Sequence, residues 1–320
     1  MVVASPYPSK NRENHPHGTA TPRGRETVSH TGAGVFSASL IVLLVLLQGC
    51  AGPAPRPGVG LRQDAVNAND RGYHYYARGN LELAREKFAQ ALRLNRLIDH
   101  VPGIAANLNN LGAIYQEQGR YHQAEDCYRE ALKLNRQQDD TAGIIETLNN
   151  LGTVWQTQGK LRQAQGAYTE AQTLAQQPGL EPLLALTLTH CGDVARQEQR
   201  YAAALKLYQQ SLQLNIAHQA ARGRAVSLER LGRLHLELGD FDQAEKNLKT
   251  ALQEFRRLES VGGVIDALEG LTRLYLARGD QSAAQDYGAR LAQLYQALGQ
   301  NDKYQEQSAL LPAARPQPEK

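Results

Sequence analysis

The nucleophilic and titratable side chains of this 320-residue chain are not arranged for catalysis. There are three cysteines and nine histidines, and no GxSxG, GxxxxGK[ST] or HExxH motif occurs. An active site needs a nucleophile beside a base, paired carboxylates in a cleft or a phosphate-binding loop. No His/Cys cluster has the spacing of metal ligands either. The sequence therefore predicts a protein that is not an enzyme and that holds neither a metal nor a cofactor.

Side-chain amides offer a different chemistry, because they recur at a fixed spacing of forty residues. The pairs Asn109-Asn110 and Asn149-Asn150 are followed seven residues after their first member by Gln116 and Gln156. An Asn side chain carries one acceptor and two donor hydrogens, so a row of amides can bind the backbone of an extended peptide without reading its sequence. Such a row needs elements that place every amide on one surface.

Composition is typical of a folded protein and argues against nucleic-acid binding. The chain is 42% hydrophobic and 21% charged, with a formal charge of +3. Residues 1–50 hold four basic and two acidic residues, so the remainder carries about +1. Binding to phosphate backbones relies on clustered Lys and Arg. We therefore expect no nucleic acid among the partners.

The elements that position the amides are repeated units. Small residues recur every forty residues in three columns, of which the third is unbroken. The first column is Gly72, Gly112, Gly152, Gly192 and Gly232; the second is Gly79, Gly119, Gly159, Gly239 and Gly279, with Gln199 in the fourth place; the third is Ala84, Ala124, Ala164, Ala204, Ala244 and Ala284. This periodicity predicts about six copies of one structural unit.

Each unit has the apolar spacing of two helices. Leu108, Leu111 and Tyr115 share one helical face, and Tyr121, Ala124 and Tyr128 begin a second face of the same kind. We expect Gly119 to lie in the turn between the two helices. The column of Gly103, Gly143, Gly223 and Gly263 is expected to mark the turn between units. A helix pair of this size cannot bury its apolar face alone, so the pairs must stack.

The unit resembles the tetratricopeptide repeat. Its consensus is matched by Gly112, Tyr115, Gly119, Tyr121, Ala124, Tyr128 and Ala131. The forty-residue period is similar to the long repeats of kinesin light chains and LGN-like adaptors. The resemblance implies an all-α, right-handed superhelical solenoid of about six antiparallel helix pairs, with a C-terminal capping helix. Repeat six departs from the consensus at Thr272, Gln281 and Gly288.

The resemblance also implies where a partner binds, since the first helix of each tetratricopeptide pair lines a concave groove. Asparagines of this kind are associated with peptide binding in kinesin-light-chain-like repeats. The expected groove amides are Asn109, Asn110, Gln116, Asn149, Asn150 and Gln156. The alternative is that the NN pairs belong to the inherited repeat unit and only face water.

Arginines and carboxylates replace the amides in repeats four to six. One hypothesis is a clamp for an acidic peptide, carried by Arg196 and Arg230, which have the least obvious local partners. The other is that the charges stabilise their own helices through i, i+4 pairs, such as Glu229 with Arg233 and Glu269 with Arg273.

The remaining cysteines and the single tryptophan are interpreted as structural. Cys191 occupies a column otherwise filled by leucine, and Trp155 occupies the column of Tyr115. Cys127 lies about two units away, which exceeds the distance of about 7 Å that a disulfide allows between Cα atoms. We expect both thiols to be free.

The N-terminus carries the features of an export signal. Residues 35–47 are thirteen residues without a charge, which suits a signal h-region better than a membrane span of about 20 residues. The sequence from Leu47 to Cys50 resembles a bacterial lipobox, with Gln48 as a departure from it. The resemblance implies lipidation of Cys50, and Ala51 after it favours the outer membrane. The alternatives are an uncleaved membrane anchor and a cleaved signal.

These features predict five segments: a disordered leader (1–34), the signal and lipobox (35–50), a Pro/Gly tether (51–63), the solenoid (64–303), and the end of a capping helix with a disordered tail (304–320). The predicted function is a lipid-anchored, periplasm-facing scaffold that binds a protein or peptide in its groove during envelope assembly. The alternatives are a structural module that self-associates, forming a homo-oligomer, and a regulatory subunit of an enzyme.

Overall fold

The computed structural model describes residues 59–310, and every regular element within them is an α-helix. The predicted leader, signal, Cys50 and the final ten residues lie outside the described residues. The helices are α2 (Val59–Ala77), α3 (Leu81–Leu97), α4 (Val101–Glu117), α5 (Tyr121–Gln137), α6 (Thr141–Thr157), α7 (Leu161–Leu174), α8 (Glu181–Gln197), α9 (Tyr201–Ala217), α10 (Ala221–Glu237), α11 (Phe241–Arg257), α12 (Val261–Arg278), α13 (Gln281–Ala297) and α14 (Asn301–Leu310).

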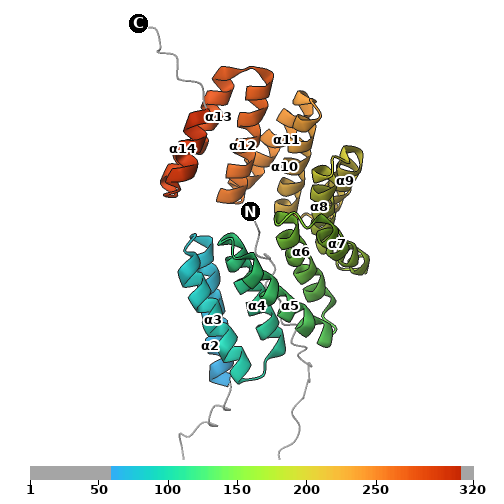
Figure 1. The fold of residues 1–320 in the computed structure, drawn as a ribbon, viewed down its shortest axis with the longest axis vertical. Helices are drawn as coiled ribbons and strands as arrows, with labels where there is room; N and C mark the ends of the chain where they lie inside the picture. The colour runs from blue at the N-terminus through green and yellow to red at the C-terminus, as the bar shows by residue number, and fades with distance from the viewer. Residues whose placement is uncertain (1–58, 311–320) are drawn as a thin grey trace, which may run out of the picture.

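The predicted architecture is confirmed. Helices α2 to α13 form six consecutive packed pairs, and α14 packs on α13 at the C-terminal end. Helix α2 begins at Val59, five residues before the boundary predicted at residue 64. The pairs stack along a curved path, so that α2 and α3 lie on the same side of the molecule as α13 and α14 (Figure 1).

Glycine has two separate uses in the repeat. The turn inside each pair has a left-handed residue at Gly119 and its equivalents, with Gln199 adopting φ 59° in the fourth repeat. The turn between pairs instead has its left-handed residue at Asp99, Asp139, Gly179, Gln219 or Glu259. The prediction that the Gly103 column marks this turn was wrong, because Gly103 and Gly143 lie inside the first turn of the next helix. A Cβ at Gly143 would lie 2.8 Å from Nδ2 of Asn135, so close approach to the preceding helix requires glycine there.

In the first five pairs, a large side chain of the second helix packs on a glycine of the first. A Cβ at Gly112 would lie 2.6 Å from the ring of Tyr128, and one at Gly152 would lie 2.3 Å from the ring of Tyr168. Both tyrosine rings are fully buried. Close packing of this kind leaves little room for larger residues at the glycine.

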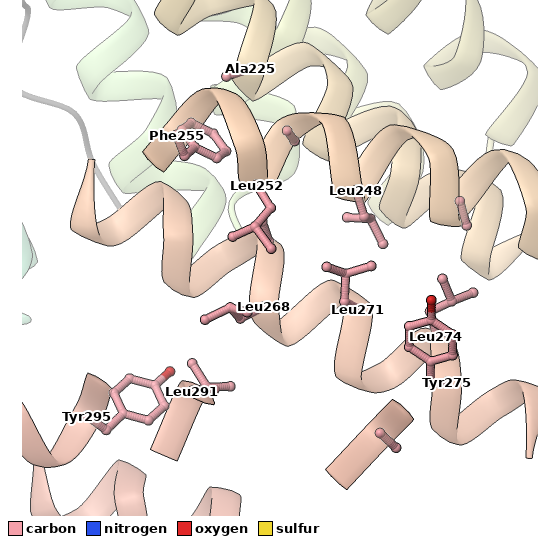
Figure 2. Close-up of a cluster of buried hydrophobic side chains, with 14 residues drawn as sticks. Ala225, Leu248, Leu252, Phe255, Leu268, Leu271, Leu274, Tyr275, Leu291 and Tyr295 are labelled. Carbon is pink, nitrogen blue, oxygen red and sulfur yellow. The ribbon is translucent and has the colours of Figure 1, made fainter. Parts of the chain in front are cut away.

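Between pairs, the core continues without interruption from helix to helix. In the last repeats, Leu248 and Leu252 of α11 point toward Leu268 and Leu271 of α12, and Leu291 of α13 continues the cluster (Figure 2). Burying one such leucine contributes about 2 kcal/mol to the free energy of folding. A lone helix pair would leave the leucine exposed and lose this contribution. The shared core explains why the repeats must stack.

From the second pair onward, the first helix of each pair also contacts the first helix of the next pair. Helix α4 contacts α6, α6 contacts α8, α8 contacts α10, and α10 contacts α12. These helices therefore form a continuous inner wall along the curve. Among residues 59–310, no helix has the length and apolar character needed to span a bilayer.

Candidate functional site on the inner wall

The inner wall presents a repeated stripe of partly or fully exposed side chains. On α6 these residues are spaced by four, three and four, which places them on one side of the helix, away from the Gly152 side that packs on Tyr168. The same positions recur on α8 and α10. We call these twelve residues the inner stripe: Glu146, Asn150, Thr153 and Thr157; Leu186, His190, Asp193 and Gln197; Val226, Arg230, Arg233 and Glu237.

Of the predicted groove amides, Asn150 belongs to the inner stripe, whereas its neighbour Asn149 does not. Asn149 is 2% exposed and its Nδ2 donates to Oγ1 of Thr187 on α8, at 2.9 Å. The two side chains differ by one helical step of 100°. Because of that step, the side chain of Asn149 lies in the contact between repeats, whereas that of Asn150 stays partly exposed.

Asn109 occupies the equivalent position one repeat earlier. Asn135 and Asn109 both donate to Oγ1 of Thr147, at 3.1 and 3.0 Å, and this hydroxyl donates to the carbonyl of Gly143 at 2.7 Å. We call Asn135, Thr147 and Asn109 the junction triad, because they join three helices between repeats two and three. Asn109 keeps part of its surface exposed.

The other predicted amides also have partners inside the solenoid. Asn110 is buried, accepting from the hydroxyl of Tyr73 and donating to Asn69, each at 3.1 Å. Gln116, which is buried, and Gln156, which is partly exposed, accept from the hydroxyls of the core tyrosines on the second helices, at 3.3 and 3.1 Å. These hydrogen bonds hold the first helices in place on the buried side of the inner wall.

The arginines of repeats four and five are paired across repeats. Arg196 forms an ion pair with Glu237 at 2.6 Å, and Arg230 pairs with Asp193 at 3.2 Å and with Glu229. Arg196 and Arg230, which have the least obvious local partners in the sequence, pair with carboxylates 41 and 37 positions away. Spacing within one helix gives no sign of such partners.

The i, i+4 interpretation of these charges holds in one case and not in the other. Glu229 and Arg233 form the predicted pair. Glu269 instead accepts from the hydroxyl of Tyr295 at 2.6 Å and lies 3.7 Å from Arg233. Ion pairing between repeats thus takes precedence over pairing along α12.

The resulting network is electrostatically negative. It joins three guanidinium groups to the carboxylates of Asp193, Glu229, Glu237, Asp266 and Glu269. The carboxylate of Glu229 raises the pKa of Arg230, and burial raises the pKa of Asp266. Since the arginines are already neutralised, this part of the wall does not favour an acidic ligand.

The junction between repeats three and four is built differently from the others. Ala175 stands where Asn95, Asn135 and Asn215 stand in other repeats, and α7 has only 14 residues. Oδ1 of Asn149 is buried there and has no hydrogen-bond partner among the described residues. The ring of His190 on α8 stacks on Tyr168 of α7, with centroids 5.2 Å apart and planes 6° from parallel. Burial lowers the pKa of His190 to about 4.

Sequence reasoning missed the junction contacts. Their signal is a column of Asn95, Asn135 and Asn215 at the ends of second helices, eight residues before Gly103, Gly143 and Gly223. Read together, the two columns indicate a polar side chain packed on a glycine. Read separately, neither column shows which residue it contacts.

The described residues also bear on cysteine chemistry and metals. In the part of the chain that the structure describes, Cys127 and Cys191 are free cysteines, and both are partly exposed. Burial raises the pKa of each thiol to about 11, so the thiolate is scarce at neutral pH. Between residues 59 and 310, no group of His, Cys, Asp and Glu is placed to hold a metal ion.

Two family models match the chain. The model described as "MalT-like TPR region" matches residues 139–310, and the model described as "Tetratricopeptide repeat" matches residues 64–137. No curated protein sequence matches.

Solved structures share the fold at low sequence identity. A Rap protein complexed with competence and sporulation factor has a TM-score of 0.59 at 13% identity, over 78% of this chain and 73% of that one. Pseudomonas aeruginosa PilF has a TM-score of 0.50 at 23% identity, over 78% of this chain and 99% of that one. PilW, a type IV pilus biogenesis factor, has a TM-score of 0.50 at 18% identity, over 71% and 91%. At such identities these likenesses show the fold alone.

Proposed function

The chain belongs to the MalT-like tetratricopeptide repeat family, whose fold is a protein–protein interaction scaffold, and from this premise we propose that its inner wall binds a segment of a partner protein at a membrane surface. The observation that carries the proposal is the inner stripe. It is a row of open side chains on consecutive first helices, supported from behind by buried hydrogen bonds.

The part of the wall formed by α4 and α6 suits the backbone of an extended segment. Asn109, Asn150 and Gln156 keep exposed surface there, while Asn110, Gln116 and Asn149 hold the wall behind them. The amide of Asn150 supplies donors and an acceptor that a peptide backbone can use without a fixed sequence. The hydroxyl of Thr153 beside it already donates to the carbonyl of Asn149 at 2.9 Å, so it can only accept. The Rap protein complexed with competence and sporulation factor, which has a similar fold, supports this use of the fold.

The part formed by α8 and α10 would read side chains. Arg196 and Arg230 can reach a ligand only through the outer atoms of guanidinium groups that already carry carboxylates. A partner segment therefore gains most from this part where it offers a basic or neutral polar residue to the excess carboxylates. The repeated amides set the position of the segment, and the charged part sets its orientation.

Affinity purification of the tagged full-length chain, with mass spectrometry of the co-eluting proteins, identifies the partner. Asn150→Arg fills the inner stripe with a large charged side chain and should abolish recovery of that partner. Gln210→Arg places the same charge on the exposed surface of α9 and serves as the control. Equal recovery with both variants would contradict binding at the wall.

The membrane location in this proposal depends on Cys50. Acylation of that thiol would add two lipid signals and hold the protein stably on a bilayer, with the body in the periplasm and the outer membrane favoured. PilW offers a precedent in which this fold serves pilus biogenesis, an envelope process. Cys50→Ser should abolish metabolic labelling with a fatty acid, and retained labelling of that variant would refute lipidation.

A further inference from the structure

A pocket of about 650 Å³ lies on the side of the solenoid formed by the second helices, away from the inner stripe. Its floor is apolar, made by Leu132 of α5 with Leu151 and Trp155 of α6. The remaining lining residues are Arg129, Lys133, Arg136, Gln137 and Gln163. Its volume is within the range of about 300–1,000 Å³ that is usual for ligand sites.

Trp155 is the feature that distinguishes this place from its equivalents in other repeats. At the same repeat position, Tyr115 is covered by the guanidinium of Arg120 at 4.7 Å, and Tyr275 stacks on Tyr287 at 5.4 Å. Among the described residues, no cation or second ring lies over the indole of Trp155. Its Nε1 donates to Oε1 of Glu125 at 2.9 Å, which fixes the ring in position.

The rim of the pocket is cationic. Arg129 pairs with Glu125 and Arg136 pairs with Glu170, both at 2.6 Å. The ammonium of Lys133 has no ion pair within residues 59–310, and none of the lining residues is acidic. A ligand that brings carboxylates therefore meets one free positive charge and two guanidinium groups that still have donors available.

From this arrangement we infer that the pocket is a second docking site, which takes a partner segment carrying a large apolar side chain flanked by Asp or Glu. The apolar side chain covers the face of Trp155 between the two leucines. The flanking carboxylates lie at Lys133 and Arg136. Tryptophan and arginine are the residue types that most often dominate the binding energy of protein interfaces. This site is independent of the proposed groove, since a segment here leaves the inner stripe open.

The chain provides its own reporter, because Trp155 is its only tryptophan. The full-length protein is titrated with the synthetic peptide Asp-Glu-Leu-Phe-Asp-Glu, which lacks tryptophan, and the indole emission is followed. We expect saturable quenching with a blue shift at low salt, and loss of the effect at high salt. Lys-Lys-Leu-Phe-Lys-Lys should produce no saturable change.

Two charge reversals test the position of the site. Lys133→Glu should raise the dissociation constant of the acidic peptide at least about tenfold, by removing one attraction and adding one repulsion. Lys206→Glu makes the same change on the exposed surface of α9 and should leave the constant unaltered. Unfolding midpoints should agree between the two variants, because both lysines lie outside the core.

Three results would overturn the inference: no saturable change in Trp155 emission, equal binding of the two peptides, or an unaltered constant in Lys133→Glu. A fourth arm uses 4-phenylbutyrate, a small aromatic anion. If it binds as tightly as the acidic peptide, the pocket is a small-molecule site and the docking proposal fails.

Discussion

The junctions before and after repeat three use different chemistry for the same task. Before it, Asn135, Thr147 and Asn109 hold three helices together through uncharged hydrogen bonds. After it, Ala175 replaces the asparagine, and Asn149 retains a buried acceptor that has no partner within residues 59–310. A titratable ring, His190, stacks there on Tyr168.

This difference has consequences for stability. A buried polar group that is satisfied stabilises its junction, whereas an unsatisfied one costs free energy. In a solenoid each repeat touches only its neighbours, so a weak junction lowers the local stability without weakening the rest. The junction between α7 and α8 should open before the junction between α5 and α6.

The largest expected effect comes from removing one of the two asparagines that donate to Thr147 in the junction triad. Asn135→Ala leaves the hydroxyl of Thr147 with one donor fewer and creates a void against Gly143. It should lower the free energy of unfolding by about 2 kcal/mol, measured by urea denaturation. Gln138→Ala, at an exposed position beside it, is the control. Equal losses in the two variants would contradict the stabilising role of the triad.

A smaller effect is expected from pH at the later junction. The pKa of His190 is about 4 in the fold and close to 6.5 in an unfolded chain. The unfolded state therefore binds more protons between these values, and stability falls as the pH drops through this window. The loss from pH 7 to pH 5 should be about 1–2 kcal/mol. His190→Gln should reduce this loss, and an unchanged pH dependence in that variant would exclude His190 as its source.

The smallest effect is expected at Asn149. Asn149→Ala loses one hydrogen bond to Thr187 but also removes the acceptor that has no partner. The two contributions oppose each other, so unfolding should change by less than about 1 kcal/mol. Chemical denaturation checks this value, and a loss as large as that of Asn135→Ala would show that the two junctions are equally strong.

Much of the fold could be predicted from the sequence, because the repeat is read directly from columns such as Gly112 and Ala124. The turn at Gly119 was predicted correctly, since the left-handed residue there is a glycine. The turn between repeats was not, because its left-handed residue is Asp99 or Asp139, and the nearby glycine serves close packing instead.

The candidate site was harder to predict than the fold. Asn149 and Asn150 are identical residues one step apart, and only the position of α8 decides which of them is covered. Likewise, Arg230 finds Asp193 on another repeat, a contact that depends on how the first helices stack. Local spacing identifies the helix and its faces, but the neighbouring repeat determines which face remains open.

The most direct measurement compares Asn149→Ala with Asn150→Ala in recovery of the co-purified partner, at equal amounts of folded protein. We expect Asn150→Ala to weaken binding of the partner about three- to tenfold, while Asn149→Ala leaves binding unchanged. Full recovery of the partner with Asn150→Ala, or an equal loss with both variants, would contradict binding at the inner stripe.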